Sequence, residues 1–171
     1  MATKMNLFMD TEFTHFAGPN DEQAQLISIG VVADDGRQFY AEVDKFRTAL
    51  CSDFVISTVL PLLECGEKVK GAPEVARCLK DYIEGFGEEC LIWSDAVSYD
   101  WPLIVDLFAD TGTQWPTNLV KKPRSVQSLQ QGRYQAFLRH QEDLLASPSC
   151  RRHHALDDAL AMREAWLKSF E

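Results

Sequence analysis

The sequence lacks long apolar runs, closely spaced cysteine pairs and an overall positive charge. No stretch approaches the roughly 20 apolar residues that cross a bilayer, and the N-terminus lacks the uninterrupted apolar core of a signal peptide. We therefore expect a cytoplasmic protein with no membrane partner. Its 171 residues contain no internal repeat and no linker-like segment, which predicts a single domain over residues 1–171.

The cysteines are few and dispersed, and none forms a C-x-x-C pair. This pattern argues against a structural zinc site and against a disulfide framework. An odd number of cysteines in a chain without an export signal fits reduced thiols instead. The five are Cys51, Cys65, Cys78, Cys90 and Cys150.

The net charge of −9 is unusual for a protein that binds nucleic acid, but the charge is unevenly distributed. Residues 119–152 carry a local charge of +5, which leaves −14 on the rest of the chain. Such a segment could present a cationic surface to an anionic ligand, or it could be a solvated face with no partner. The candidates for phosphate contact are Lys121, Lys122, Arg124 and Arg152.

The first third of the chain predicts an antiparallel meander. Apolar, β-branched and aromatic residues predict strands at about 5–11, 24–33 and 37–43. A polar loop containing Gly18-Pro19 separates the first two strands. Asp34-Asp35-Gly36 is typical of the tight turn of a hairpin.

Helices and one further strand follow the meander. A short buried strand is predicted at residues 90–93, and a helix is expected to begin near Asp100. Other helices are predicted at 53–64, which Pro61 interrupts, at 73–86 between Pro73 and Gly87, at 125–145 and at 154–169. Helices that alternate with strands after a meander predict an α/β fold with a mixed sheet.

Asp10 and Glu12 are the first candidate site residues. They follow the apolar run Leu7-Phe8-Met9, and alternate residues of a strand project from the same face. Two carboxylates at the end of a core strand repel each other and lose hydration, which a divalent cation such as Mg²⁺ or Mn²⁺ relieves. In the alternative, one acid caps a turn and the other is solvated.

Asp100 is the third candidate acid, in Ser98-Tyr99-Asp100-Trp101-Pro102. Aspartate is favoured at helix N-caps and proline in first turns, so Asp100 could be a cap residue. A site role and a capping role are compatible, because a carboxylate near a helix N-terminus stays ionised.

The last helix supplies the remaining candidates. At 100° per residue, Asp157 falls on the expected solvent side, whereas Asp158 falls at the edge of the apolar stripe. His153 is five residues before Asp158, so it can join the site only from the loop that precedes the helix. An imidazole there is a plausible general base; alternatively, His153 is an exposed cap residue. His154 is the weaker substitute.

These motifs together resemble the DEDDh 3′–5′ exonucleases of the DnaQ-like, ribonuclease H-like superfamily. The resemblance rests on Asp10-Thr11-Glu12-Phe13-Thr14, on Tyr99-Asp100 and on the C-terminal run from His153 to Ala159. The three motifs occur in the family's order and span nearly the whole chain. The short length and the Asp-Thr-Glu-Phe-Thr form are similar to the small mycobacterial-type exoribonuclease branch.

The resemblance implies a five-stranded mixed sheet with helices on both sides and a site for two Mg²⁺ or Mn²⁺ ions. It implies that Asp10 bridges both ions and that Glu12 and Asp158 bind the one that activates water. Asp100 is implied to bind or orient the second ion, and His153 to accept the proton from the attacking water.

The implied reaction releases nucleoside 5′-monophosphates from the 3′ end of single-stranded RNA, or alternatively of DNA. Backbone amides around Thr11 and Phe13 are implied to bind the terminal sugar. Phe13, His15 and Phe16 could stack on bases or fold onto the core, and Arg152 could bind a phosphate. A silent nucleic-acid-binding module and a phosphohydrolase of small nucleotides are the competing hypotheses. A homodimer is compatible with the resemblance, although no segment marks an interface.

Overall fold

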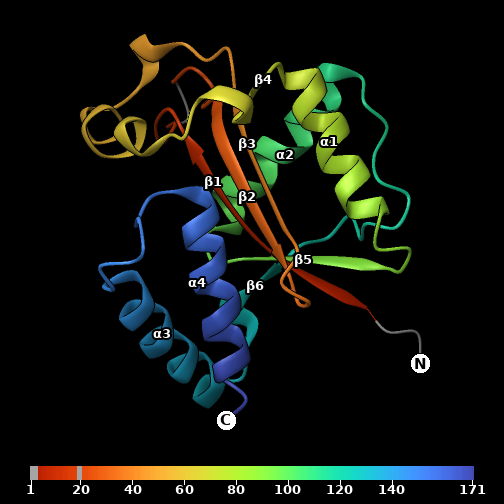
Figure 1. Ribbon diagram of the computed structural model, residues 1–171, viewed down its shortest axis with the longest axis vertical. Helices are drawn as coiled ribbons and strands as arrows, with labels where there is room; N and C mark the ends of the chain where they lie inside the picture. The colour runs from red at the N-terminus through yellow and green to blue at the C-terminus, as the bar shows by residue number, and fades with distance from the viewer. Residues whose placement is uncertain (1–3, 19–20) are drawn as a thin grey trace.

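A mixed β-sheet runs through the centre of the computed structural model, which describes residues 4–18 and 21–171 (Figure 1). Over these residues the sheet has six strands in the order β4-β3-β2-β1-β5-β6. They are β1 (Met5–Phe13), β2 (Leu26–Ala33), β3 (Gln38–Val43), β4 (Val69–Lys70), β5 (Cys90–Ser94) and β6 (Arg124–Ser125). The first three strands form an antiparallel meander, whereas β5 pairs with β1 in parallel.

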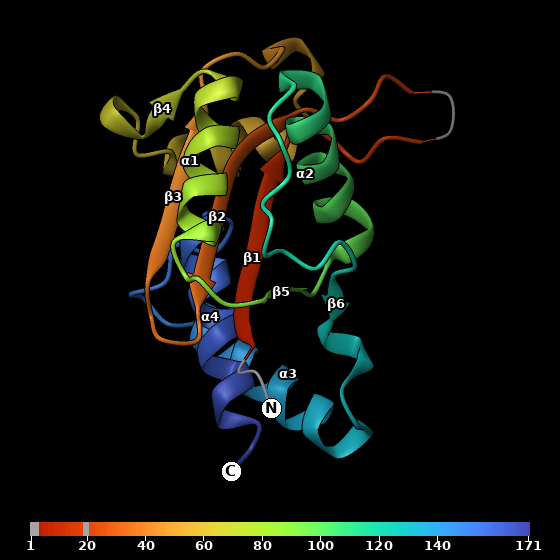
Figure 2. The same cartoon turned by 90° about the vertical axis from the view of Figure 1, so that its right-hand side faces the viewer.

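Helices cover both faces of the sheet, so that in Figure 2 α1 lies in front of it and α4 behind it. One apolar core lies between the sheet and α1 and α2, and a second lies between the sheet and α3 and α4. The helices are α1 (Ala72–Glu84), α2 (Val97–Thr111), α3 (Gln131–Leu145) and α4 (Ala155–Lys168). In the described part of the chain, no helix combines the length and the apolar character that a membrane span requires.

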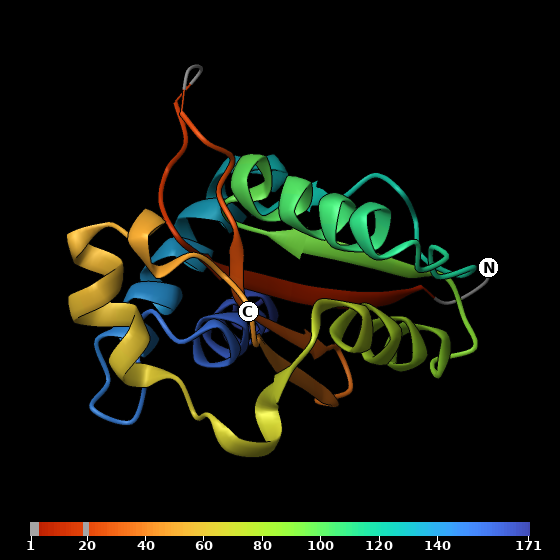
Figure 3. The same ribbon diagram turned by 90° about the horizontal axis from the view of Figure 1, so that it is seen from above.

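The segment between β3 and β4 consists of short 3₁₀ and π-helical pieces rather than one regular α-helix. Its pieces are η1 (Thr48–Leu50), η2 (Val55–Val59), η3 (Leu60–Leu62) and η4 (Gly66–Lys68). The helix predicted at 53–64 is present as adjoining π and 3₁₀ pieces, and Pro61, which lacks the N–H that a continuing α-helix needs, lies in the last of them. In Figure 3 this segment, drawn in orange to yellow, lies beside the blue loop that precedes α4.

The α/β architecture and the meander are confirmed, while several element boundaries differ from the prediction. The sheet has six strands rather than the five that the resemblance implied. Its two edge strands, β4 and β6, are only two residues long each. α3 begins at Gln131 because Arg124–Ser128 form β6 and a 3₁₀ turn instead. The C-cap of α1 is Gly85 rather than Gly87. Part of the predicted Gly18-Pro19 turn, at Pro19, lies outside the described residues.

Asp100 is not the N-cap of its helix. α2 begins at Val97 with Ala96 as N-cap, so Asp100 lies in the first turn, and Pro102 follows inside the helix. The extra residues at the start turn the Asp100 side chain inward, where it is 1% exposed. The capping interpretation is therefore wrong, and the carboxylate faces the interior.

Gly30 sets the distance between α4 and the sheet. It lies opposite Asp10 in the β1–β2 register. A Cβ atom at this position would collide with the backbone of Ala155 and Leu156 in the first turn of α4. The absence of a side chain on β2 therefore lets the start of α4 lie directly beside Asp10.

We expect Gly30→Ala to lower the free energy of unfolding by about 1–3 kcal/mol, because the added methyl group forces two backbones apart. Urea denaturation followed by circular dichroism measures this change. The matched control is Gly132→Ala in α3, where an added Cβ meets no atom within 4 Å. This control should raise stability by about 0.5–1 kcal/mol. Equal stability of Gly30→Ala and the wild type would contradict the close approach.

Candidate active site

Four carboxylates from three elements meet in one cavity of about 480 Å³. Asp10 and Glu12 project from the same face of β1, as the strand period predicts. Asp100 comes from the first turn of α2 and Asp158 from the first turn of α4. His153 lines the same cavity. The structure thus brings together all five residues that the sequence selects as catalytic candidates.

The acids form two groups within the cavity. In one, single ligand atoms of Glu12, His153 and Asp158 lie within 4.8 Å of one another. In the other, the same holds for Asp10, Asp95 and Asp100. Asp95 follows the last residue of β5 and was missed at the sequence level. The parallel pairing of β5 with β1 places the residues that follow both strands at the same end of the sheet.

Hydrogen bonds fix the Asp100 carboxylate. Thr11 Oγ1 donates to Asp100 Oδ1 at 2.6 Å, and Ser94 Oγ donates to the other carboxylate oxygen. The Ala96 N–H donates in turn to Ser94 Oγ at 2.9 Å. Thr11, predicted to contact substrate, is buried and uses its side chain to position an acid.

Two adjacent aspartates organise the loop before α4. His153 lies in this loop, as predicted, with a left-handed backbone (φ 71°). Its N–H donates to Asp158 Oδ2 at 3.0 Å. The Arg151 N–H donates in the same way to Asp157 Oδ2 at 2.8 Å. One carboxylate therefore holds each end of the turn that presents His153.

Asp157 lies on the side of α4 away from the acidic cavity, as predicted, but it is covered more than a solvent-facing residue would be. Its side chain is 14% exposed because the Arg151 guanidinium folds over it and also binds Glu64 at 3.1 Å. The cavity is lined by Asp158 rather than by Asp157. His154, the weaker candidate for the base, is buried against the Tyr40 ring, with centroids 4.5 Å apart, and does not line the cavity.

Burial and mutual repulsion raise the pKa of every acid in the cavity. Burial raises the pKa of Glu12 to about 8, and the charges of Asp158 and Asp100 contribute. Burial raises the pKa of Asp100 and of Asp158 to about 6 against opposing hydrogen bonds. The pKa of Asp10 lies well above its usual value because of burial and then the charge of Asp100.

The donor set fits divalent cations of the Mg²⁺ and Mn²⁺ type. Such hard cations prefer carboxylate oxygens, which make up both groups apart from one imidazole. Asp158 Oδ1 is also a buried oxygen without a hydrogen-bond partner among the described residues. A bound cation would satisfy this oxygen and offset the repulsion that the raised pKa values record.

Aromatic side chains form the outer wall of the cavity. Phe16 and Tyr99 contact each other edge to face, with ring centroids 4.9 Å apart, and the Phe13 ring stacks on Tyr99. Phe54, from the segment between β3 and β4, contacts the His153 ring edge to face with centroids 5.0 Å apart. Phe16, Phe54 and Tyr99 are 69%, 50% and 47% exposed. The sequence did not assign Tyr99 or Phe54 to a substrate surface.

His15 and Arg152, the other predicted substrate contacts, differ in their placement. His15 lines the cavity, but both ring nitrogens bind the loop, Nδ1 to Thr14 Oγ1 at 3.0 Å and Nε2 to the Glu22 carbonyl at 2.9 Å. Arg152 lies outside the lining and donates to Glu142 at 3.3 Å. The structure therefore gives each of these side chains a partner within the protein.

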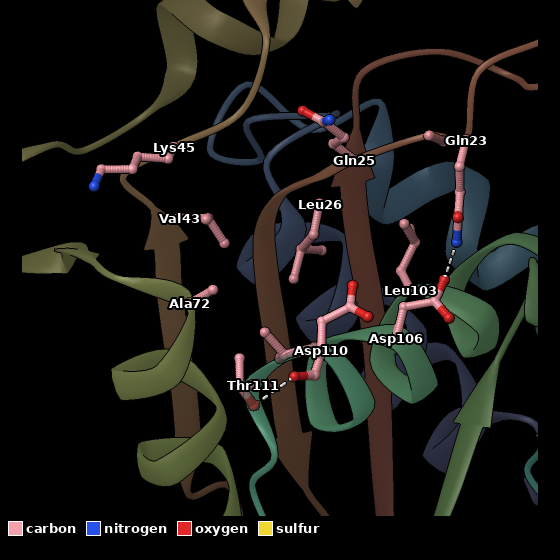
Figure 4. A pocket seen from close by; sticks show the side chains of 12 residues that line it. Gln23, Gln25, Leu26, Val43, Lys45, Ala72, Leu103, Asp106, Asp110 and Thr111 are labelled. Atoms are coloured by element: carbon pink, nitrogen blue, oxygen red, sulfur yellow. Dashed lines mark hydrogen bonds between the residues drawn. The ribbon is translucent and has the colours of Figure 1, made fainter.

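A second cavity, of about 300 Å³, lies on the other side of the sheet and is lined by α2 and the ends of β2 and β3 (Figure 4). Asp106 and Asp110 face it, but Asp106 accepts a hydrogen bond from Gln23. Within residues 4–18 and 21–171, the two groups described above are the ones with metal-ligand spacing. The second cavity is therefore not a comparable candidate.

Known proteins share both sequence and fold with this chain. Two curated 3′–5′ exoribonucleases, from two strains of Mycobacterium tuberculosis, are each 28% identical over 130 residues, or 74% of this chain and 73% of theirs. The nuclease domain of 3′hExo, a DEDDh family member solved bound to rAMP, gives a TM-score of 0.64 at 15% identity, covering 94% of this chain and 88% of that one. The chain has the fold of the DEDDh nucleases.

A second solved structure has a similar fold. S. pombe Pop2p, in its Mg²⁺ and Mn²⁺ bound form, gives a TM-score of 0.63 at 15% identity and covers 94% of this chain and 81% of that one. No family model matches the sequence. The resemblance to DEDDh nucleases that the motifs predicted is confirmed.

We expect the metal-free protein to lose stability as pH rises from about 5 to 8. A carboxyl group whose pKa is raised by folding keeps its proton when the unfolded chain has released it, so folding takes up protons in this range. The free energy of unfolding, measured in EDTA by urea titration, should fall by on the order of 2 kcal/mol or more. Saturating Mn²⁺ or Mg²⁺ should remove most of the decline.

Glu12→Gln provides the internal test, because the pKa of Glu12 is raised furthest among the acids with an assigned value, to about 8. This variant should flatten the curve between pH 6 and 8. The control Glu67→Gln lies on the exposed η4 turn and should leave the curve unchanged. A metal-free stability that rises between pH 5 and 8 would show that the acids do not repel one another.

Proposed function

We propose that this chain is a metal-dependent 3′–5′ exonuclease that shortens single-stranded RNA from its 3′ end and releases nucleoside 5′-monophosphates. The observation that carries the proposal is the meeting of four acids and His153 in one cavity. A binding module would gain nothing from buried anions facing a polyanion. The curated relatives are named 3′–5′ exoribonucleases, which favours RNA as the substrate. One catalytic domain accounts for the activity.

The acids suit hydrolysis of a phosphodiester. Glu12 and Asp158 would hold one divalent cation, and Asp10 and Asp100 would hold another. Two such cations supply a water of lowered pKa and offset the charge that develops on the scissile phosphate. The hydrogen bonds to Asp100 and from the His153 N–H keep the ligands in place before substrate arrives.

His153 is assigned the role of general base. Its imidazole lies beside Glu12 and Asp158 and is carried by a fixed turn. Burial and the Arg152 charge lower the pKa of His153, so the ring is neutral and able to accept a proton at neutral pH. The proton comes from the water that attacks phosphorus.

The aromatic wall is assigned to the terminal base. Phe16, Tyr99 and Phe54 expose apolar surface directly outside the acidic floor of the cavity. Stacking on aromatic rings tolerates any base, which suits an enzyme that must degrade every sequence it meets. A single strand can place its last base against this wall, whereas a paired end would first have to open.

We expect 5′-labelled single-stranded RNA to shorten progressively from the 3′ end in Mn²⁺ or Mg²⁺, and EDTA to stop the reaction. Gel electrophoresis resolves the ladder, and a DNA strand of the same sequence tests the preference for RNA. Asp158→Asn should reduce the rate at least about 10³-fold, because it removes a cation ligand while retaining an acceptor for the His153 N–H. Its matched control is Asp143→Asn on an exposed face of α3.

Internal cleavage, or early release of the 5′ label, would overturn the proposed direction. Faster cleavage of DNA than of RNA would overturn the choice of substrate. A fully active Asp158→Asn variant would show that the acidic cavity is not the active site.

We expect His153→Ala to lower kcat by about 10²–10⁴-fold with little change in Mn²⁺ affinity, as removal of a general base does. Single-turnover kinetics and isothermal titration calorimetry measure the two quantities. The wild-type rate should decline on the acid side only below the ordinary imidazole pKa, because that of His153 is lowered. A collapse of Mn²⁺ affinity in His153→Ala would identify the imidazole as a ligand instead.

A further inference from the structure

We propose that Asp95 is an additional cation ligand, which completes with Asp10 and Asp100 a site of three carboxylates, and that Gln141 positions it. This inference rests on the proposed function, because it concerns the same cavity. It adds the residue that follows β5 and a residue from α3 to a site otherwise built from β1, α2 and α4.

The sheet register brings Asp95 level with Asp10. Phe8 on β1 pairs with Trp93 on β5, and both rings pack into the core beneath α3 and α4. Two residues further along each chain are Asp10 and Asp95. The ladder ends at Phe8 and Trp93, and just beyond it the ligand atoms of Asp10 and Asp95 lie within 4.8 Å of each other.

Gln141 shows that the position of Asp95 is built into the structure. It lies on α3, is 8% exposed, and donates from Nε2 to Asp95 Oδ2 at 2.7 Å. A buried amide on a helix is costly unless it is hydrogen-bonded, and here the bond orients an acid toward other acids. If the bond from Gln141 only stabilised the fold, a neutral acceptor would serve equally well. Here the acceptor is the Asp95 carboxylate, which lies beside the carboxylates of Asp10 and Asp100.

The geometry leaves room for a cation to bind. A carboxylate offers about four lone-pair sites, so Asp95 can accept from Gln141 and still ligate a metal. The ligand atoms of Asp10, Asp95 and Asp100 lie within 4.8 Å of one another.

The energetics also favour a ligand role. The ligand atoms of Asp10, Asp95 and Asp100 lie within 4.8 Å of one another, so their negative charges repel when no cation lies between them. Without a cation, Asp95 therefore destabilises the folded state. A cation reverses the sign of this contribution, because each additional anion then strengthens its binding.

Asp95→Asn keeps the shape of the side chain and removes its charge. It should therefore raise the stability of the metal-free protein and lower the stabilisation that a bound cation provides. In EDTA at pH 8, its melting temperature should exceed that of the wild type, because one repelling charge is gone. In Mn²⁺ its stabilisation should be smaller. Titration calorimetry, with electron paramagnetic resonance to count bound Mn²⁺, should show one of two sites weakened at least tenfold.

Gln141→Met tests the positioning role, because methionine fills a similar volume and cannot hydrogen-bond. It should weaken the same Mn²⁺ site by a smaller factor, and Gln141→Glu should weaken it further by adding a repelling charge beside Asp95. Asp143→Asn, two residues along α3 and exposed, is the control and should bind Mn²⁺ like the wild type.

Asp10→Asn separates the failure of this inference from failure of the proposed function. If Asp10→Asn loses Mn²⁺ while Asp95→Asn binds it like the wild type, Asp95 is not a ligand and the nuclease proposal stands. If the wild type itself binds no Mn²⁺, both fail. An unchanged melting temperature of Asp95→Asn in EDTA would also overturn the inference, because it would place Asp95 outside the field of the other acids.

Discussion

Repulsion among buried carboxylates is the constraint on which the rest of the structure depends. Asp10, Glu12, Asp100 and Asp158 share one cavity, and burial together with mutual charge raises the pKa of each. Left alone, such groups would separate or bind protons. The fold prevents separation through the sheet register and the close approach at Gly30, where β2 leaves space for the first turn of α4. The clustered carboxylates thus lower the stability of the metal-free protein, but they form a site that a cation can bind.

Each acid is held by a different local device. Asp100 accepts hydrogen bonds from two hydroxyl groups, Asp158 accepts from the His153 backbone, and Asp95 accepts from a buried amide. These contacts restrict rotation of the carboxylates without neutralising their charge, since none of the donors is a cation. A lysine or arginine in the same positions would occupy the place of the metal. Neutral donors therefore give a preorganised site that remains anionic.

Much of this site could be predicted from the sequence because it depends on short-range periodicity. The strand period placed Asp10 and Glu12 on one face, and the helix period separated Asp158 from Asp157. Asp95 was missed because it depends on pairing between β1 and β5, which are about 80 residues apart in the chain. The environment of Asp157 was missed for a similar reason, since Arg151 folds back over it from an irregular loop. The short helical pieces at 48–68 follow no regular spacing of apolar residues. The sequence therefore could not predict that Phe54 lines the cavity or that it contacts His153.

The short helical pieces between β3 and β4 contribute to the cavity differently from the strands and helices of the central fold. The acids lie on strands and long helices, whereas Phe54 and Glu64 contact the His153 ring and Arg151 from a segment of short 3₁₀ and π-helical pieces. The buried Glu42 carboxylate anchors the end of this stretch by accepting from the N–H groups of Glu64 and Cys65. Substitutions in the segment between β3 and β4 would leave the central sheet unchanged. A lineage can thus acquire new preferences for the end of a polymer while inheriting an unaltered chemical centre.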